Sequence, residues 1–123
     1  MQFNGPEHEE FYKKYESNDV YRNCLWYVIG VSDITRLHIN DIYDFAEHCI
    51  KPEVLNAEWM SSSTSALIRL AFDLYHGDPV LSDDNLDNEK KETELTLYSV
   101  SNIFSRLNEW KIYALEAISI MYK

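Results

Sequence analysis

The stretch from Ser61 to His76 is apolar around most of a helical circumference. The positions that break this pattern share one helical face: Ser65, Arg69, Asp73 and His76. A hydroxyl-rich run precedes the stretch, and Gly77 and Pro79 follow it, which predicts a helix over residues 62–76. A helix with so little polar surface must be covered by others, so we expect it at the centre of a bundle.

Helical periodicity of apolar residues continues on both sides of this stretch. The further helices or helical turns that it predicts span residues 7–16, 19–31, 32–40, 41–50, 53–60, 92–106 and 109–122. No segment alternates long enough for a firm strand, and only the four residues after Pro79 could form one. We therefore predict a single compact all-α domain over residues 1–123, a bundle of about five or six helices with 62–76 and 109–122 at its centre.

Composition supports a packed helical core and excludes several classes of protein. Hydrophobic residues make up 46% of the chain and aromatic residues 14%, with only three Gly and three Pro, which argues against disorder and against an all-β sandwich. No signal peptide or membrane span is predicted, and Cys24 and Cys49 are expected to be buried, reduced thiols. These features indicate a cytoplasmic protein.

The formal net charge of −10 disfavours direct binding to nucleic acid or to an anionic membrane. A basic protein surface is the partner that such a charge attracts, although solubility alone would also explain it. The acidic residues concentrate in the connection 78–94, whose length is typical of a functional or mobile segment. The candidate partner-binding residues there are Asp78, Asp83, Asp84, Asp87, Glu89, Glu92 and Glu94.

A second acidic group lies in the predicted helix 41–50. The three-residue spacing of Asp41, Asp44 and Glu47 places them along one helical edge, and Asp44 is four residues before His48. Such a row could bind a divalent cation or orient the histidine, but it lacks the companion spacing of helical metal sites. We favour a solvated face that adds to the partner-binding surface, with no metal and no cofactor.

Five other residues form an alternative ligand-binding group: Arg36, His38, His48, Arg69 and Asp73. Arg36 could bind an anion, although a pairing with the acids of the following predicted helix is favoured. Arg69 and Asp73 are four residues apart on the central helix, and a buried ion pair between them is expected. No nucleophile elbow, glycine-rich phosphate loop or metal-binding motif occurs, which disfavours an enzyme.

Several segments together resemble a family of small uncharacterised proteins of Firmicutes and their phages. They are TRLHINDIYDF (35–45), CIKPE (49–53), RLAFDLY (69–75), YSVSNIF (98–104) and EAISIMY (116–122). The resemblance implies a phage or mobile-element setting and assigns no residue roles.

Charge, size and this setting lead to one favoured function and two alternatives. The favoured function is a non-enzymatic inhibitor, similar to an anti-CRISPR protein, that covers the basic groove of a bacterial defence nuclease. The first alternative is a small-molecule-binding module or modest hydrolase with a pocket between helices. The second is a regulatory homo-oligomer, for example a homodimeric toxin–antitoxin component with a partly exposed last helix.

Overall fold

The computed structural model describes residues 1–123 and is essentially all-α, as predicted. In chain order the elements are α1 (Pro6–Tyr15), α2 (Val20–Ile29), α3 (Asp33–Leu37), α4 (Ile39–Ile42), β1 (Tyr43–Asp44), β2 (Cys49–Ile50), the 3-10 helix η1 (Pro52–Asn56), α5 (Ser62–His76), α6 (Asn88–Thr96), α7 (Val100–Leu107), the 3-10 helix η2 (Asn108–Trp110) and α8 (Lys111–Tyr122). The helices are more numerous and shorter than predicted. None of them combines the length and apolar composition that a membrane crossing requires.

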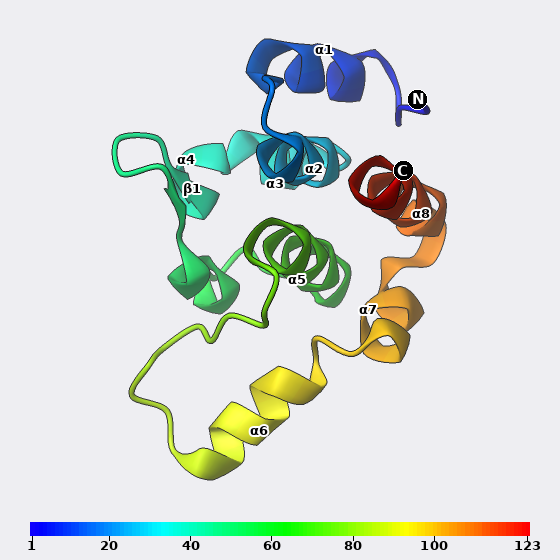
Figure 1. Cartoon of the computed structure of the whole chain (residues 1–123). Helices are drawn as coiled ribbons and strands as arrows, with labels where there is room; N and C mark the ends of the chain where they lie inside the picture. Colours follow the sequence, from blue (N-terminus) through cyan, green and yellow to red (C-terminus); the bar gives the residue numbers. More distant parts are fainter.

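Helix α5 is the centre of the fold, with other elements on all sides of it (Figure 1). Residues 64–72 are all buried, and the prediction of its two ends is confirmed. At the start, the Ser61 hydroxyl accepts a hydrogen bond from the backbone N–H of Thr64 at 3.1 Å. At the end, Gly77 adopts the left-handed conformation with φ of 90°, which glycine reaches without strain.

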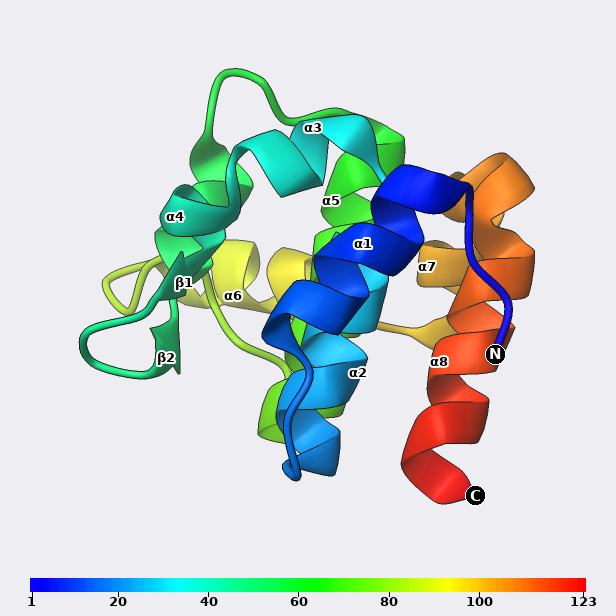
Figure 2. The same ribbon diagram turned by 90° about the horizontal axis from the view of Figure 1, so that it is seen from above.

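Helix α2 is the second central helix and packs along α5. Its residues 24–29 are buried without interruption. Helix α1 crosses over α2 (Figure 2) and inserts His8, which is fully buried. The His8 Nε2 atom lies 2.7 Å from the backbone oxygen of Tyr27, and its Nδ1 atom accepts from the backbone N–H of Asn4 at 2.8 Å. A carbonyl oxygen can only accept, so His8 is the neutral tautomer with its proton on Nε2.

Helix α8 is not central, and this part of the prediction is wrong. Only Ala114 and Ala117 are buried in it, and these small residues let α8 approach α2 and α5 closely along one stripe. Ile112, Leu115 and Tyr122 point outward and are 48%, 59% and 76% exposed. A helix with apolar residues on all faces does not reveal from sequence which face meets the bundle.

The predicted helix 41–50 is also wrong, because the chain leaves the helical conformation after Ile42. Residues 43–50 form a two-stranded antiparallel hairpin in which Tyr43 pairs with Ile50 and Asp44 with Cys49. The Asp44 carboxylate accepts from the backbone N–H groups of Ala46 and Glu47, which stabilises a turn in competition with a helix. No strand follows Pro79, and Cys49 is exposed and not buried.

The predicted helix 92–106 is divided into two helices. Helix α6 ends at Thr96, and the Ser99 hydroxyl caps α7 by accepting from the backbone N–H of Asn102 at 3.2 Å. Helix α6 begins earlier than predicted, where the Asp87 carboxylate accepts from the backbone N–H of Lys90 at 2.8 Å. None of its residues is buried, so α6 lies on the surface of the bundle (Figure 1).

Candidate functional site

The largest concave feature is a cleft of about 490 Å³ between η1, α6 and the loop that precedes α6. We call it the acidic cleft. The residues that line it are Asn56, Ser82, Asp83, Leu86, Asp87, Glu89, Lys90, Thr93 and Glu94. Four of these nine residues carry carboxylates, against one lysine and one apolar side chain. The cleft is therefore a polar, negatively charged site and differs from the apolar pockets that small molecules usually occupy.

Glu94 fixes the shape of the acidic cleft by holding the loop against α6. One of its carboxylate oxygens accepts from the backbone N–H of Ser82 at 2.9 Å, and the other accepts from the Ser82 hydroxyl at 2.7 Å. A few residues away, the Tyr98 hydroxyl donates to the backbone oxygen of Val80 at 2.6 Å. The acidic connection is thus anchored at two points. The carboxylates that precede Glu94 in the sequence are therefore held on one side of the molecule.

Arg69 lies near Glu94 and Tyr98 and does not form the ion pair with Asp73 that the sequence predicts. Its guanidinium carbon is 6.0 Å from the centre of the Tyr98 ring. The side chain is 9% exposed, and burial lowers its pKa while Tyr98 and Glu94 act in the opposite direction. Burial, and then the nearby charge of Asp78, raise the pKa of Asp73. An arginine placed before an aspartate on a helix is the weaker order, and the long Arg69 side chain instead reaches Tyr98, in the connection between α6 and α7.

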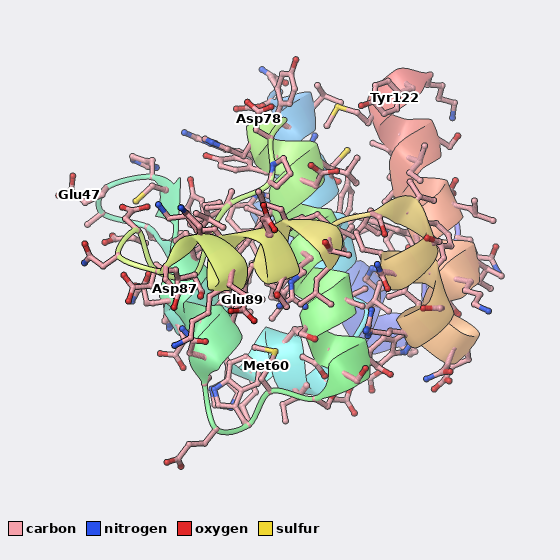
Figure 3. All side chains as sticks on the ribbon, turned by 90° about the horizontal axis from the view of Figure 1, so that it is seen from below. Glu47, Met60, Asp78, Asp87, Glu89 and Tyr122 are labelled. Atoms are coloured by element: carbon pink, nitrogen blue, oxygen red, sulfur yellow. The ribbon has the colours of Figure 1, made fainter.

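The other carboxylates of the acidic cleft keep oxygens that are free to accept from a partner. Asp83 accepts from the backbone N–H of Asn85 at 2.9 Å, and Asp87 caps α6. Glu89 is exposed at the first turn of α6, beside Asp87 in Figure 3. The structure therefore brings together four of the seven acids predicted in the segment 78–94.

The remaining acids of that segment lie outside the acidic cleft. Asp84 and Glu92 are exposed but do not line it. Asp78 lies at the far end of α5, away from Asp87 and Glu89 (Figure 3). Sequence reasoning missed the lining residues that are not acidic. Lys90, Thr93 and Glu94 share one face of α6 at helical spacing, which was a usable signal, whereas nothing in the sequence links Asn56 to this face.

The predicted acidic row in residues 41–47 does not exist, because the hairpin replaces the helix. Asp41 contacts His38, whose Nδ1 atom is 3.0 Å from the carboxylate. Asp44 is used in the turn, and Glu47 lies at the tip of the hairpin loop (Figure 3). No group of three or more histidine, cysteine, aspartate or glutamate side chains is arranged to hold a metal ion.

The residues of the predicted alternative ligand site are dispersed. Arg36 donates to the backbone oxygen of Gly30 at 2.5 Å and pairs with Asp33. The His38 ring stacks on Trp59, with ring centres 4.0 Å apart and an angle of 7° between the planes. His48 lines a different, smaller cleft. The structure does not bring these residues together with Arg69 and Asp73 as one site.

Comparison with models of protein families places the whole chain in one family. The model described as "Family of unknown function (DUF6075)" matches residues 1–123. The chain therefore belongs to this family, in agreement with the resemblance to uncharacterised proteins. No curated protein matches the chain, and no solved structure does.

Proposed function

We propose that the chain is a non-enzymatic interaction protein that binds a basic protein surface through the acidic cleft. The observation that carries the proposal is the convergence of Asp83, Asp87, Glu89 and Glu94 in one cleft whose lining contains a single cation, Lys90. Lysine and arginine side chains of a partner would enter the cleft, and an arginine could bind a carboxylate through two parallel hydrogen bonds.

Electrostatics determines what such a site recognises and how binding responds to salt. The net charge of −10 gives a long-range attraction to a basic partner and repulsion from nucleic acid. Exposed charges are screened beyond about 8 Å at physiological salt, so the association rate should fall as salt rises. The partner class that suits this surface is a nucleic-acid-binding protein, where carboxylates would occupy positions otherwise taken by phosphates.

The family setting gives the proposal a concrete form. The resemblance to proteins of Firmicutes and their phages supports an inhibitor of a bacterial defence nuclease that acts as anti-CRISPR proteins do. The inhibitor would occlude the basic groove of the nuclease without any chemical step. The absence of a recognisable catalytic motif in the sequence agrees with this form.

The experiment compares two variants that carry the same charge. In the cleft variant, Asp83→Asn, Asp87→Asn and Glu89→Gln remove three negative charges, so the net charge of −10 becomes −7. Asparagine also caps helices, so α6 should remain intact. The control variant is Glu7→Gln, Glu10→Gln and Glu16→Gln, which makes the same change on and just after α1, at the opposite end of the molecule from α6 (Figure 1).

The probes are a fluorescent peptide of alternating lysine and arginine, and a basic nuclease whose activity is followed. We expect the wild type to bind both, and the cleft variant to bind about tenfold more weakly, the effect of losing roughly 1.4 kcal/mol. The control variant should stay close to the wild type. Equal weakening of both variants would show that net charge alone acts, and absence of salt-dependent binding by the wild type would refute the proposal.

A further inference from the structure

A second cleft, of about 220 Å³, lies where the end of α1, the start of α2 and the β1–β2 hairpin meet. We call it the aromatic cleft. The residues that line it are Lys14, Tyr15, Ser17, Arg22, Trp26, Tyr43, Phe45 and His48. Half of them are aromatic, and none carries a carboxylate. The chain has 21 acidic residues and 11 lysines and arginines, so this lining departs from the character of the rest of the surface.

The aromatic side chains form stacked walls. The Phe45 ring is parallel to Trp26 within 8°, with centres 5.6 Å apart, and lies within 27° of Tyr15 at 5.5 Å. Tyr43 meets the edges of both Trp26 and Phe45, at 4.9 Å and 5.1 Å. Phe45 belongs to the hairpin and is 36% exposed, which leaves ring surface available to a ligand. A flat aromatic molecule gains most from such walls.

Two buried donors at the aromatic cleft make no hydrogen bond. Tyr43 is 1% exposed, and its hydroxyl makes no hydrogen bond. Burial, and then the neighbouring Tyr75 hydroxyl, raise the pKa of Tyr43. The Tyr75 hydroxyl donates to the backbone oxygen of His48 at 3.3 Å, and its own oxygen can still accept. The Nε atom of Arg22 is also buried without a hydrogen bond. Buried polar groups are nearly always satisfied. The acceptors nearest to these two atoms, the Tyr75 hydroxyl and the Asp19 carboxylate, make no well-formed hydrogen bond with them, so an acceptor in the cleft would improve their pairing.

The charged residues around the aromatic cleft indicate which charge the accepting group of a ligand would carry. Lys14 and Arg22 are cations, and no carboxylate in the lining opposes them. Asp19 lies 3.5 Å from the Arg22 Nε atom but does not line the cleft. An arginine has only donors, so the atom that satisfies it must be an acceptor, and a negatively charged oxygen makes the strongest such bond.

We propose that the aromatic cleft binds a small aromatic anion. The ring of the ligand packs against Tyr15, Trp26 and Phe45, and its carboxylate or phosphate accepts from the Tyr43 hydroxyl and from Arg22. This site shares no residue with the acidic cleft, so each proposal can fail without the other. The two possible anions share the same chemistry, and the test separates them.

The test measures binding of four probes to the full chain by calorimetry. Benzoate and phenyl phosphate carry both ring and anion, benzyl alcohol carries only the ring, and inorganic phosphate carries only the anion. We expect at least one aromatic anion to bind more tightly than benzyl alcohol and inorganic phosphate, and the tighter of the two identifies the anionic group. Failure of both at about 10 mM, where even a weak site is filled, would overturn the proposal. Equal binding of benzyl alcohol would do the same.

Two tyrosine variants separate binding from a structural role. Tyr43→Phe removes only the unpartnered hydroxyl, so it should weaken binding about fivefold, the usual loss for one hydrogen bond, without lowering the melting temperature. Tyr98→Phe is the matched control, because its hydroxyl donates to Val80. It should lower the melting temperature and leave binding unchanged. Arg22→Gln, on a partly exposed side chain, should also weaken binding. Unchanged affinity in both Tyr43→Phe and Arg22→Gln would refute the assignment.

Discussion

Acid should destabilise this fold through His8, and the size of the effect follows from its environment. The side chain is fully buried, its Nε2 proton is donated to the Tyr27 backbone oxygen, and its Nδ1 atom accepts from Asn4. A second proton would have to displace the Asn4 N–H. Burial is the main cause that lowers the pKa of His8 from 6.5 to about 4, and the hydrogen bond to Tyr27 opposes it only in part.

The direction of the pH effect on stability depends on whether the folded or the unfolded chain binds the proton at the higher pH. As pH falls below 6.5 the unfolded chain takes up a proton on His8, whereas the folded chain does not until about pH 4. The free energy of unfolding therefore decreases from pH 6.5 downward and levels off below pH 4. The loss from this one group is about 2 kcal/mol at pH 5 and about 3 kcal/mol in full, at 1.36 kcal/mol for each pKa unit. Above pH 7.5 the group has no effect.

The assay is urea unfolding, followed by circular dichroism at pH 8 and at pH 5, for the wild type and His8→Gln. The variant removes the titrating group, so it should lose about 2 kcal/mol less between the two pH values than the wild type. The raised pKa of Asp73 acts with the opposite sign in both proteins and cancels from the comparison. Equal losses in the wild type and His8→Gln would refute the reasoning.

Three further predictions test the packing. Gly30→Ala should cost about 1–3 kcal/mol by urea unfolding, because the new Cβ would lie 2.8 Å from the His8 ring in the close crossing of α1 over α2. Gly77→Ala should cost only about 1 kcal/mol, since its φ of +90° is strained for alanine but no atom lies within 4 Å. A thiol reagent at pH 8 should modify only the exposed Cys49 in the folded chain, because Cys24 is buried and burial raises its pKa to about 11. In urea both should react, and fast labelling of two thiols without urea would contradict the packing.

The sequence predicted elements best where local signals agreed. Helix α5 has a hydroxyl cap before it, a glycine after it and an apolar pattern between, and both ends match the structure. The segment 41–50 carries the same helical periodicity, but the Asp44 side chain bonds to the two backbone N–H groups that follow and the chain turns. Periodicity cannot report this competition, because the turn and the helix place apolar residues at similar intervals.

The candidate sites depend on tertiary contacts to different degrees. The acids of the acidic cleft could be predicted from the sequence because they all lie in one segment, 83–94. The sequence did not indicate that this segment packs beside η1. The aromatic cleft was not predicted. It combines residues from three separate segments, and each of its aromatic side chains alone is typical of a core position. The feature that sets Tyr43 apart is a buried hydroxyl without a hydrogen bond, and only the structure could show it.

Helix α6 and the β1–β2 hairpin, which each form one wall of a cleft, contribute little to the core. Helix α6 buries none of its residues, and Tyr43 is the one buried residue among 43–50. Among the largest fully buried side chains, Tyr43 is the one that these two elements contribute, so the central packing of α2 and α5 depends on them at this residue alone. Exposed substitutions of this kind usually change stability by less than about 0.5 kcal/mol. Altered binding in variants of these two elements can therefore be assigned to the clefts themselves, because the bundle that presents them should remain folded.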